Sequence, residues 1–341
     1  MADSDRDSLA GARGEVVRSM EPFLREHIDS LLKPVEESWQ PADLLPDMAA
    51  GDWRSQLSEF RERAQALPDE LLVCLVGDMI TEEALPSYQT WLNRLQGVED
   101  PSGTSDAPWA RWGRGWTAEE NRHGDLLNQY LYLSGRVDMR AIQTSIQYLI
   151  NHGFDPHTGD DPYLGFVYTT FQERATKISH RNVGDLGKRA GEDRLHRICG
   201  LIAADEARHE RAYKLFMSRI FTLDPNGAVL AFAQMMRTTI VMPAQLMGPG
   251  GDPSLFARFS RVAQKAGVYT AADYAGIIAA LLADWNVARL RGLSGEAAEA
   301  QDYLCGLAHR YQRLADRRER SKVGDAEPFP WISKRVVRGT G

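Results

Sequence analysis

The chain has 341 residues, and 40 lysines and arginines against 47 aspartates and glutamates give it a formal charge of −7. This length can bury a substantial core, and 43% hydrophobic with 26% charged residues is typical of a folded globular protein rather than a disordered one. The acidic balance disfavours nucleic acid as the main partner, because nucleic-acid-binding domains are usually basic. The 3 cysteines fit neither a disulfide framework nor a zinc pattern.

The amino-terminal sequence MADSDRDSLAGARGE lacks the apolar segment of a signal peptide, and the longest apolar run, AGIIAALLA at 275–283, is too short to span a membrane. We therefore expect a chain that does not associate with membranes. The expected location is a bacterial cytoplasm, with the plastid stroma as the alternative for a mature chain.

Helical patterns dominate the chain, and we find no convincing alternating strand pattern. Asp-Pro pairs at 161–162, 224–225 and 252–253 are typical helix starts. Thr117 and Glu120 could form a capping box, and Pro86 should kink the helix that it interrupts. The predicted helices are 20–33, 53–66, 68–97, 117–135, 137–152, 162–190, 192–222, 225–241, 253–266, 270–290 and 295–320. The sequence thus predicts one all-α domain over 1–341, with residues 1–18 as a poorly ordered arm and 323–341 as a tail that could hold a short hairpin.

Two helical segments share the pattern A-[ED]-E-x-R-H. They are AEENRH at 118–123 and ADEARH at 204–209. Within each, Glu-x-x-His places a carboxylate and an imidazole on one face of the helix, one turn apart. One such pair would mean little, but two with matching flanks indicate a shared site.

Two further glutamates complete the pattern on separate helices, Glu82 and Glu173. The order Glu, Glu-x-x-His, Glu, Glu-x-x-His is that of ferritin-like bundles that bind two iron or manganese ions. The predicted ligands are Glu82, Glu120, His123, Glu173, Glu206 and His209. Four carboxylates neutralise two divalent cations, whereas burying them together without metal would be costly. Oxygen and imidazole donors favour iron or manganese over a closed structural zinc site.

Each ligand also has an ordinary structural interpretation. Glu120 could serve only in the capping box, and Glu82 and Glu173 could be surface glutamates. Arg122 and Arg208 occupy equivalent positions in the two repeats and could pair ligand carboxylates across the bundle, or could lie on the surface. For the six predicted ligands the metal interpretation is favoured, because otherwise all of them would have to match the order and helix placement of a two-metal site by chance.

The chain resembles the soluble acyl-[acyl-carrier-protein] desaturases, to which the plant stearoyl-carrier-protein desaturases belong. The matching segments are LVGDMITEEALPSYQ (75–89), WTAEENRHGDLLNQYLYLSGRVDM (116–139), YLGFVYTTFQERAT (163–176) and IAADEARHERAY (202–213), and the resemblance runs from about residue 20 to 331. It implies a ferritin-like helical domain with packed extra helices, usually a homodimer, holding two Fe2+ on the six residues above. It further implies O2-dependent insertion of a cis double bond into an acyl chain on acyl carrier protein, with electrons from ferredoxin.

The resemblance also implies roles for residues beside the metals. Thr176 matches a threonine of the oxygen-side pocket, although it could simply bond back to a helix carbonyl. Asp205 and Trp39 match an electron-entry route, although Trp39 could be a core tryptophan.

The accepted acyl chain length depends on one helix that lines the family's acyl tunnel. On this helix, Trp91 and Arg94 replace residues that are smaller or uncharged in the plant enzymes. Bulk at the tunnel end would shorten the accepted chain; we expect a C16–C18 chain and a Δ9 double bond. The predicted tunnel residues are Trp91, Leu92, Leu95 and Gly165.

Three alternatives remain open. Another di-iron oxidase such as a ribonucleotide reductase small subunit would need a radical-forming tyrosine where this chain has Leu127. An iron-storage or metal-dependent binding protein would not use the extra helices. A homologue that binds acyl carrier protein or iron without catalysis is disfavoured by the intact ligand set.

Overall fold

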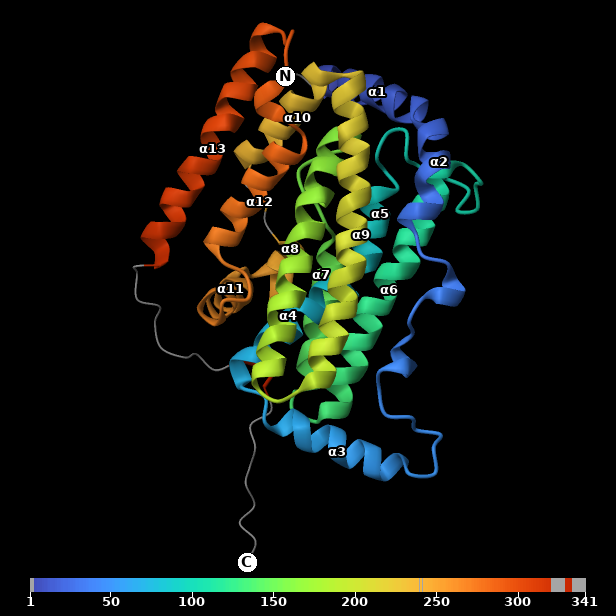
Figure 1. Cartoon of the computed structure of the whole chain (residues 1–341), viewed down its shortest axis with the longest axis vertical. Helices are drawn as coiled ribbons and strands as arrows, with labels where there is room; N and C mark the ends of the chain where they lie inside the picture. Colours follow the sequence, from blue (N-terminus) through green and yellow to red (C-terminus); the bar gives the residue numbers. More distant parts are fainter. Residues whose placement is uncertain (1–2, 239, 241, 320–328, 333–341) are drawn as a thin grey trace, which may run out of the picture.

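The computed structural model describes residues 3–238, 240, 242–319 and 329–332, and most of this part of the chain is helical (Figure 1). The α-helices are α1 (Asp3–Ser19), α2 (Glu21–Leu31), α3 (Trp53–Gln65), α4 (Asp69–Glu83), α5 (Leu85–Leu92), α6 (Pro108–Ser134), α7 (Met139–His152), α8 (Pro162–Arg189), α9 (Asp193–Leu223), α10 (Pro225–Thr238), α11 (Ser254–Ala266), α12 (Ala271–Asp284) and α13 (Gly295–Glu319). The only strand-like pairing among the described residues is an isolated bridge between Val137 and Ile332.

The centre of the molecule is a bundle of α4, α6, α8 and α9. Each contacts two of the others, α8 against α9, α9 against α6, α6 against α4 and α4 against α8. Helix α4 is buried at every position from Leu71 to Glu82, so its side chains are apolar on almost all sides, as a central helix requires. The predicted all-α, ferritin-like arrangement is confirmed for the described residues.

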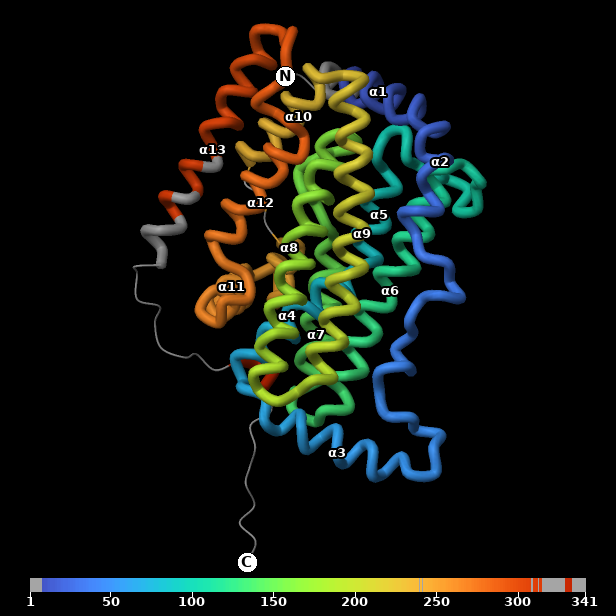
Figure 2. The backbone as a smooth tube through the Cα atoms, viewed as in Figure 1, coloured from blue at the N-terminus to red at the C-terminus, as the bar shows by residue number. Residues whose placement is uncertain are grey.

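The remaining helices surround this bundle (Figure 2). Helices α10 and α12 pack on α8, and α13 covers both of them, while α7 and α11 pack on α4. Helix α1 contacts α8 and α9 at the end where α8 begins, and α3 crosses the other end, where the Arg61 side chain donates a hydrogen bond to the Leu133 carbonyl at 3.0 Å. Both open ends of the bundle core are therefore covered.

Several element boundaries differ from expectation. Helix α6 begins at Pro108, not near 117, so Thr117 lies within the helix, where its hydroxyl donates to the Gly113 carbonyl at 2.7 Å. The predicted capping box is therefore wrong. The run 68–97 is broken rather than kinked, because Pro86 has no N–H to donate to the Glu82 carbonyl and a new helix, α5, begins at Leu85.

Over its described part, residues 3–18, the expected poorly ordered arm is helical instead. Residues 3–19 form α1, and its Arg13 is buried, where it pairs with Asp161 and stacks on the Tyr163 ring. Asp161 in turn caps α8, because its side chain accepts hydrogen bonds from the Tyr163 and Leu164 amides. The predicted tail lies mostly outside the described residues, but Trp331 is fully buried and its indole donates to Ser145 at 3.1 Å.

No single helix in the described ranges is long and apolar enough to cross a membrane. Within these ranges, one pair of helical segments, Ser254–Ala266 and Ala271–Arg289, meets the length and composition requirements together, and the two are bent by 83°.

The buried pair of Arg13 and Asp161 leads to a stability prediction. Burial raises the pKa of Asp161 even with Arg13 beside it, so removing the guanidinium should raise this pKa further. We expect Arg13→Met to lower the free energy of unfolding by about 3 kcal/mol at pH 7. A carboxyl group whose pKa is raised by folding makes the protein less stable as pH rises. The difference in free energy of unfolding between the parent and Arg13→Met should therefore shrink towards pH 4, where Asp161 can be neutral in both.

Denaturant unfolding of both proteins across this pH range measures the difference. Arg18→Met is the matched control. Arg18 lies on the exposed face of the same helix and pairs with Glu15 of that helix and with Glu99 from another segment. An Arg13→Met effect no larger than the control's would contradict the role assigned to the buried pair.

Candidate metal centre

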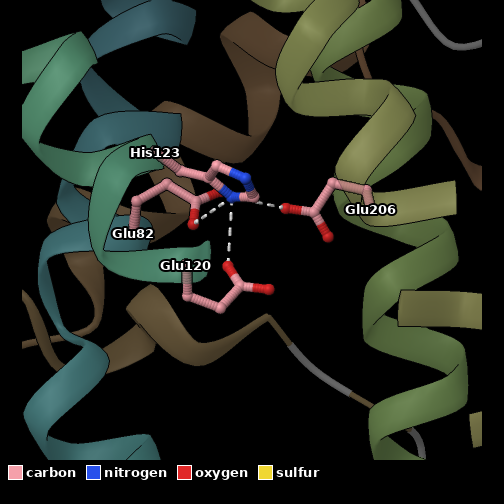
Figure 3. A group of neighbouring side chains, drawn as sticks. All are labelled: Glu82, Glu120, His123 and Glu206. Atoms are coloured by element: carbon pink, nitrogen blue, oxygen red, sulfur yellow. Dashed lines mark ion pairs between the residues drawn. The ribbon is translucent and has the colours of Figure 1, made fainter. Parts of the chain in front are cut away.

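The bundle brings all six predicted ligands together. Every side chain is buried, and four helices supply them: α4 carries Glu82, α6 carries Glu120 and His123, α8 carries Glu173, and α9 carries Glu206 and His209. Their ligand atoms form two overlapping groups, each within 4.8 Å. The first contains Glu82, Glu120, His123 and Glu206 (Figure 3), and the second contains Glu120, Glu173, Glu206 and His209.

Glu120 and Glu206 belong to both groups and therefore lie between the two positions. The two oxygens of Glu120 face different imidazoles: Oε2 is 3.1 Å from His123 Nδ1, and Oε1 is 2.6 Å from His209 Nδ1. Glu206 Oε1 lies 3.2 Å from His123 Nδ1. A carboxylate whose oxygens point in two directions suits a bridge between two cations.

Glu82 and Glu173 each belong to one group and lie at its outer side. Glu82 Oε2 is 3.8 Å from His123 Nδ1, and Glu173 Oε2 is 3.6 Å from His209 Nδ1. Each position thus has one terminal glutamate, one imidazole and two shared glutamates.

Unsatisfied atoms support a metal at this place. Although buried, Glu120 Oε1, Glu206 Oε1 and both imidazole Nδ1 atoms lie close to one another without the geometry of a hydrogen bond, and they have no other partner within the described structure. Buried polar atoms without partners are rare in folded proteins, and these four point towards the shared centre. Carboxylate oxygens with imidazole nitrogens are ligands that suit iron or manganese, so the residues present fit a pair of divalent cations.

The outer nitrogens of the two histidines face carboxylates supplied by the opposite repeat. His123 Nε2 is 3.5 Å from Asp205 Oδ2, and His209 Nε2 is 2.9 Å from Glu119 Oε2. Such outer carboxylates fix the orientation and tautomer of a metal-binding imidazole. Glu119 was missed from the sequence, although it occupies the same position in its repeat as Asp205 and could have been found by comparing the two.

The repeated arginines pair these outer carboxylates rather than the ligand carboxylates. Arg122 lies 3.3 Å from Asp205, and Arg208 pairs with Glu119 and lies 3.0 Å from Asp205. Trp39 joins the same network, because its indole N–H donates to Asp205 at 3.1 Å and its ring stacks on His123 with centroids 6.0 Å apart. The structure therefore brings Trp39 and Asp205 together beside the cluster.

Protons compensate the buried charge when no metal is bound. Burial opposes ionisation of Glu120, but the imidazoles of His123 and His209 outweigh it and hold the pKa of Glu120 below its ordinary value. Burial disfavours the imidazolium forms, but Glu120 and neighbouring carboxylates hold both histidine pKa values well above the ordinary value. For Glu173, burial dominates and its pKa lies well above the ordinary value. Metal binding would therefore release protons.

Thr176 lies where expected, on α8 one turn after Glu173. Its hydroxyl is 2.8 Å from Glu206 Oε2 and 3.1 Å from the carbonyls of Gln172 and Glu173. A hydroxyl has a single proton, so donation to Glu206 and back-bonding to the helix are alternatives. Both interpretations made from the sequence thus have a geometric basis.

An apolar cavity adjoins the cluster. It is lined by Thr81, Glu82, Leu85, Tyr88, Trp91, Leu92, Trp116, Glu120, Phe154, Tyr168, Thr169, Gln172, Glu173, Thr176, Glu206 and Pro243. Of the predicted tunnel residues, Trp91 and Leu92 line it. Leu95 and Gly165 are not among the residues that line it. Leu95 packs beside Gly165, where an added Cβ would come within 2.6 Å of Leu95 Cδ1, and their place in a tunnel stays a prediction.

The aromatic residues beside Trp91 in the cavity wall were not predicted from the sequence. The Trp91 ring meets those of Phe154 and Tyr168 edge-on, with centroids 5.4 and 5.7 Å away, and its indole donates to Thr158 at 2.9 Å. These partners come from a loop and from α8, and no local pattern in the sequence links them to Trp91.

Comparisons with known proteins agree with this site. The family profile described as fatty acid desaturase matches residues 12–333. A stearoyl-[acyl-carrier-protein] 9-desaturase, chloroplastic, from Brassica napus is 57% identical over 97% of this chain and 83% of the relative, and its counterpart from Spinacia oleracea is 56% identical over the same shares. An acyl-[acyl-carrier-protein] desaturase, chloroplastic, from Cucumis sativus is 55% identical over 97% of this chain and 84% of that protein.

The fold is similar to the X-ray structure of DesA2 from Mycobacterium tuberculosis H37Rv. The TM-score is 0.51 at 18% identity, with 81% of this chain and 97% of that chain covered. At this identity the likeness supports the helical fold alone.

The raised pKa of Glu173 gives a prediction for the metal-free chain. A carboxyl group whose pKa is raised by folding makes the protein less stable as pH rises towards that pKa. Glutamine has the shape of the neutral carboxyl group and does not ionise. In chelator, we expect Glu173→Gln to be more stable than the parent at pH 8 by on the order of 1 kcal/mol, with the difference vanishing below pH 4. Denaturant unfolding measures it. Glu62→Gln on the exposed side of α3 serves as the control, and a Glu173→Gln variant less stable at pH 8 would refute the prediction.

Proposed function

The chain belongs to the fatty acid desaturase family, and from this premise we propose that it is an acyl-[acyl-carrier-protein] desaturase, an oxidoreductase of fatty acid biosynthesis. One observation carries the proposal: four cluster carboxylates, Glu82, Glu120, Glu173 and Glu206, line the same cavity as a set of apolar side chains. An oxidising metal pair beside a hydrocarbon-binding cavity is the arrangement that oxidation of an unactivated acyl chain requires.

The proposed reaction converts a –CH2–CH2– unit into a cis –CH=CH– unit. One O2, two electrons and two protons enter, and two waters leave, so the two hydrogens removed from the chain end in water. Acyl carrier protein presents the substrate and ferredoxin supplies the electrons. Two Fe2+ bound by the six ligand residues would supply O2 activation and redox capacity.

The protein's own residues position the chain and exclude water. Adjacent methylenes do not differ in acidity, so the cavity wall must select the reacting carbons by holding them beside the cluster. The wall is mostly aromatic and aliphatic, which keeps water away from the reacting carbons. For electron entry, we propose the route from Trp39 through Asp205 to His123, whose hydrogen bond, stacking and ion-pair contacts are continuous.

The double bond is proposed at Δ9 of a C16–C18 chain, in keeping with the 9-desaturase names of the relatives. We further propose a homodimer. The relatives are named as chloroplastic, and for this chain we propose a bacterial cytoplasm, with the plastid stroma as the alternative.

An assay of the iron-loaded chain tests the function. Palmitoyl- and stearoyl-carrier protein, NADPH, ferredoxin reductase, ferredoxin and O2 are supplied, and the released acyl chains are analysed by gas chromatography–mass spectrometry. We expect a monounsaturated product. No product from a fully loaded, reducible protein that still consumes O2 would favour another di-iron oxidase instead, and a loaded protein that consumes none would indicate a non-catalytic homologue.

Thr176 is proposed to hold a proton beside Glu206 and the cavity, where O2 would be handled. We expect Thr176→Val to release more H2O2 per double bond than the parent, because the proton donor is lost, whereas Thr176→Ser should retain coupling. Product and H2O2 are measured in the same reactions. Equal coupling in all three proteins would show that the hydroxyl only bonds back to the helix.

Trp91 is proposed to limit the length of the acyl chain. Trp91→Leu shortens the wall between Phe154 and Tyr168, so the ratio of stearoyl to palmitoyl turnover should rise by roughly tenfold or more, the range expected for one or two methylenes in an apolar pocket. Trp53→Leu, on α3, is the control and should not change the ratio. An unchanged ratio in a stably folded Trp91→Leu protein would contradict the proposal.

A further inference from the structure

The two terminal glutamates are held by different partners. Each turns its Oε2 towards the cluster and its Oε1 away from it. Glu173 Oε1 accepts a hydrogen bond from the Trp116 indole at 3.0 Å, whereas Glu82 Oε1 lies 2.7 Å from His180 Nε2. Each half of the centre also has one imidazole and one outer carboxylate, so the partners of the terminal glutamates are one place where the halves differ.

His180 is not a member of either ligand group, although it is almost fully buried. It lies on α8, two turns after Glu173, and Glu82 separates it from the cluster. On its other side, His180 Nδ1 faces Asp78 Oδ2 at 3.7 Å, and Asp78 Oδ1 accepts from the Ser179 hydroxyl at 2.7 Å. The histidine is thus placed between two carboxylates of α4 that are one helical turn apart.

Apolar packing alone does not explain why three polar residues lie together here. Asp78, Ser179 and His180 are all buried in a region where α4 is otherwise apolar, and burying polar groups costs free energy unless they bond to one another. The one ligand that the arrangement touches is Glu82. Its effect must therefore be sought in how Glu82 is held.

We propose that His180 is a positioning residue that donates a hydrogen bond through Nε2 to Glu82 Oε1, and that it thereby leaves Oε2 for the cation bound with His123 and makes the two metal positions inequivalent. A hydrogen bond to one oxygen fixes the rotation of the carboxylate and turns the other oxygen towards the cation. Glu173 is held in the same way by a neutral indole, whose N–H cannot be lost to a base at ordinary pH. The inference rests on the proposed metal pair.

Metal titration of three variants tests the inference. Partners that orient a ligand typically change metal affinity by 10- to 100-fold. We expect His180→Leu to weaken the binding of one of two Co2+ ions by about that factor while the other binds as in the parent. His180→Gln keeps an N–H donor and should restore much of the affinity. Trp116→Phe removes the donor from Glu173 and should weaken the other ion.

Stoichiometry is measured by equilibrium dialysis, and the affected position is identified by Mössbauer spectra of 57Fe-loaded protein. In His180→Leu, one of two iron signals should change. If the parent binds two metals and His180→Leu binds both with unchanged affinity and spectra, the inference is wrong and the proposed function stands. Equal weakening of both ions, or no rescue by His180→Gln, would also refute it. A parent chain that binds fewer than two metals would overturn the proposed metal pair together with the inference.

Discussion

Four carboxylates within a few ångströms of one another in a helical core are the constraint on which the rest of the site depends. Such a cluster is unfavourable unless cations or protons compensate its charge. Without metal, the histidines retain protons and Glu173 favours its neutral form. Two divalent cations would balance the four carboxylate charges, and the same residues would then be their ligands. The interactions around the cluster are consistent with this: both histidines face outer carboxylates, and arginines pair those carboxylates in turn.

The two repeated segments exchange these contacts. Asp205, from the second repeat, faces the histidine of the first, and Glu119, from the first, faces the histidine of the second. These crossed contacts hold α6 against α9 at the level of the carboxylate cluster. Close helix approach has the same effect between α6 and α4, because a Cβ on Gly124 would lie 3.3 Å from the backbone of Glu82. A small residue beside His123 thus lets the two helices carry their ligands to one centre.

The sequence was sufficient to predict which six residues lie together at the centre of the bundle, and insufficient to predict which residues contact them. On a helix, residues three positions apart lie on the same face. Glu120 could therefore be paired with His123, and Glu206 with His209, by their spacing alone. His180 and Trp116 contact ligands that are distant in the chain, and no spacing rule connects them. The same holds for Phe154 and Tyr168 at the cavity. Arg13 is a similar case: the amino-terminal segment has weak helix signals, and its buried arginine pairs with Asp161, the residue that caps α8.

The most direct test of the account is an anomalous-scattering map of crystals of the iron-loaded chain, recorded at the iron edge. We predict two peaks, both between Glu120 and Glu206, one next to His123 and the other next to His209. A single peak, or peaks outside the residues named here, would contradict the claim that the buried carboxylates exist to hold a pair of metals.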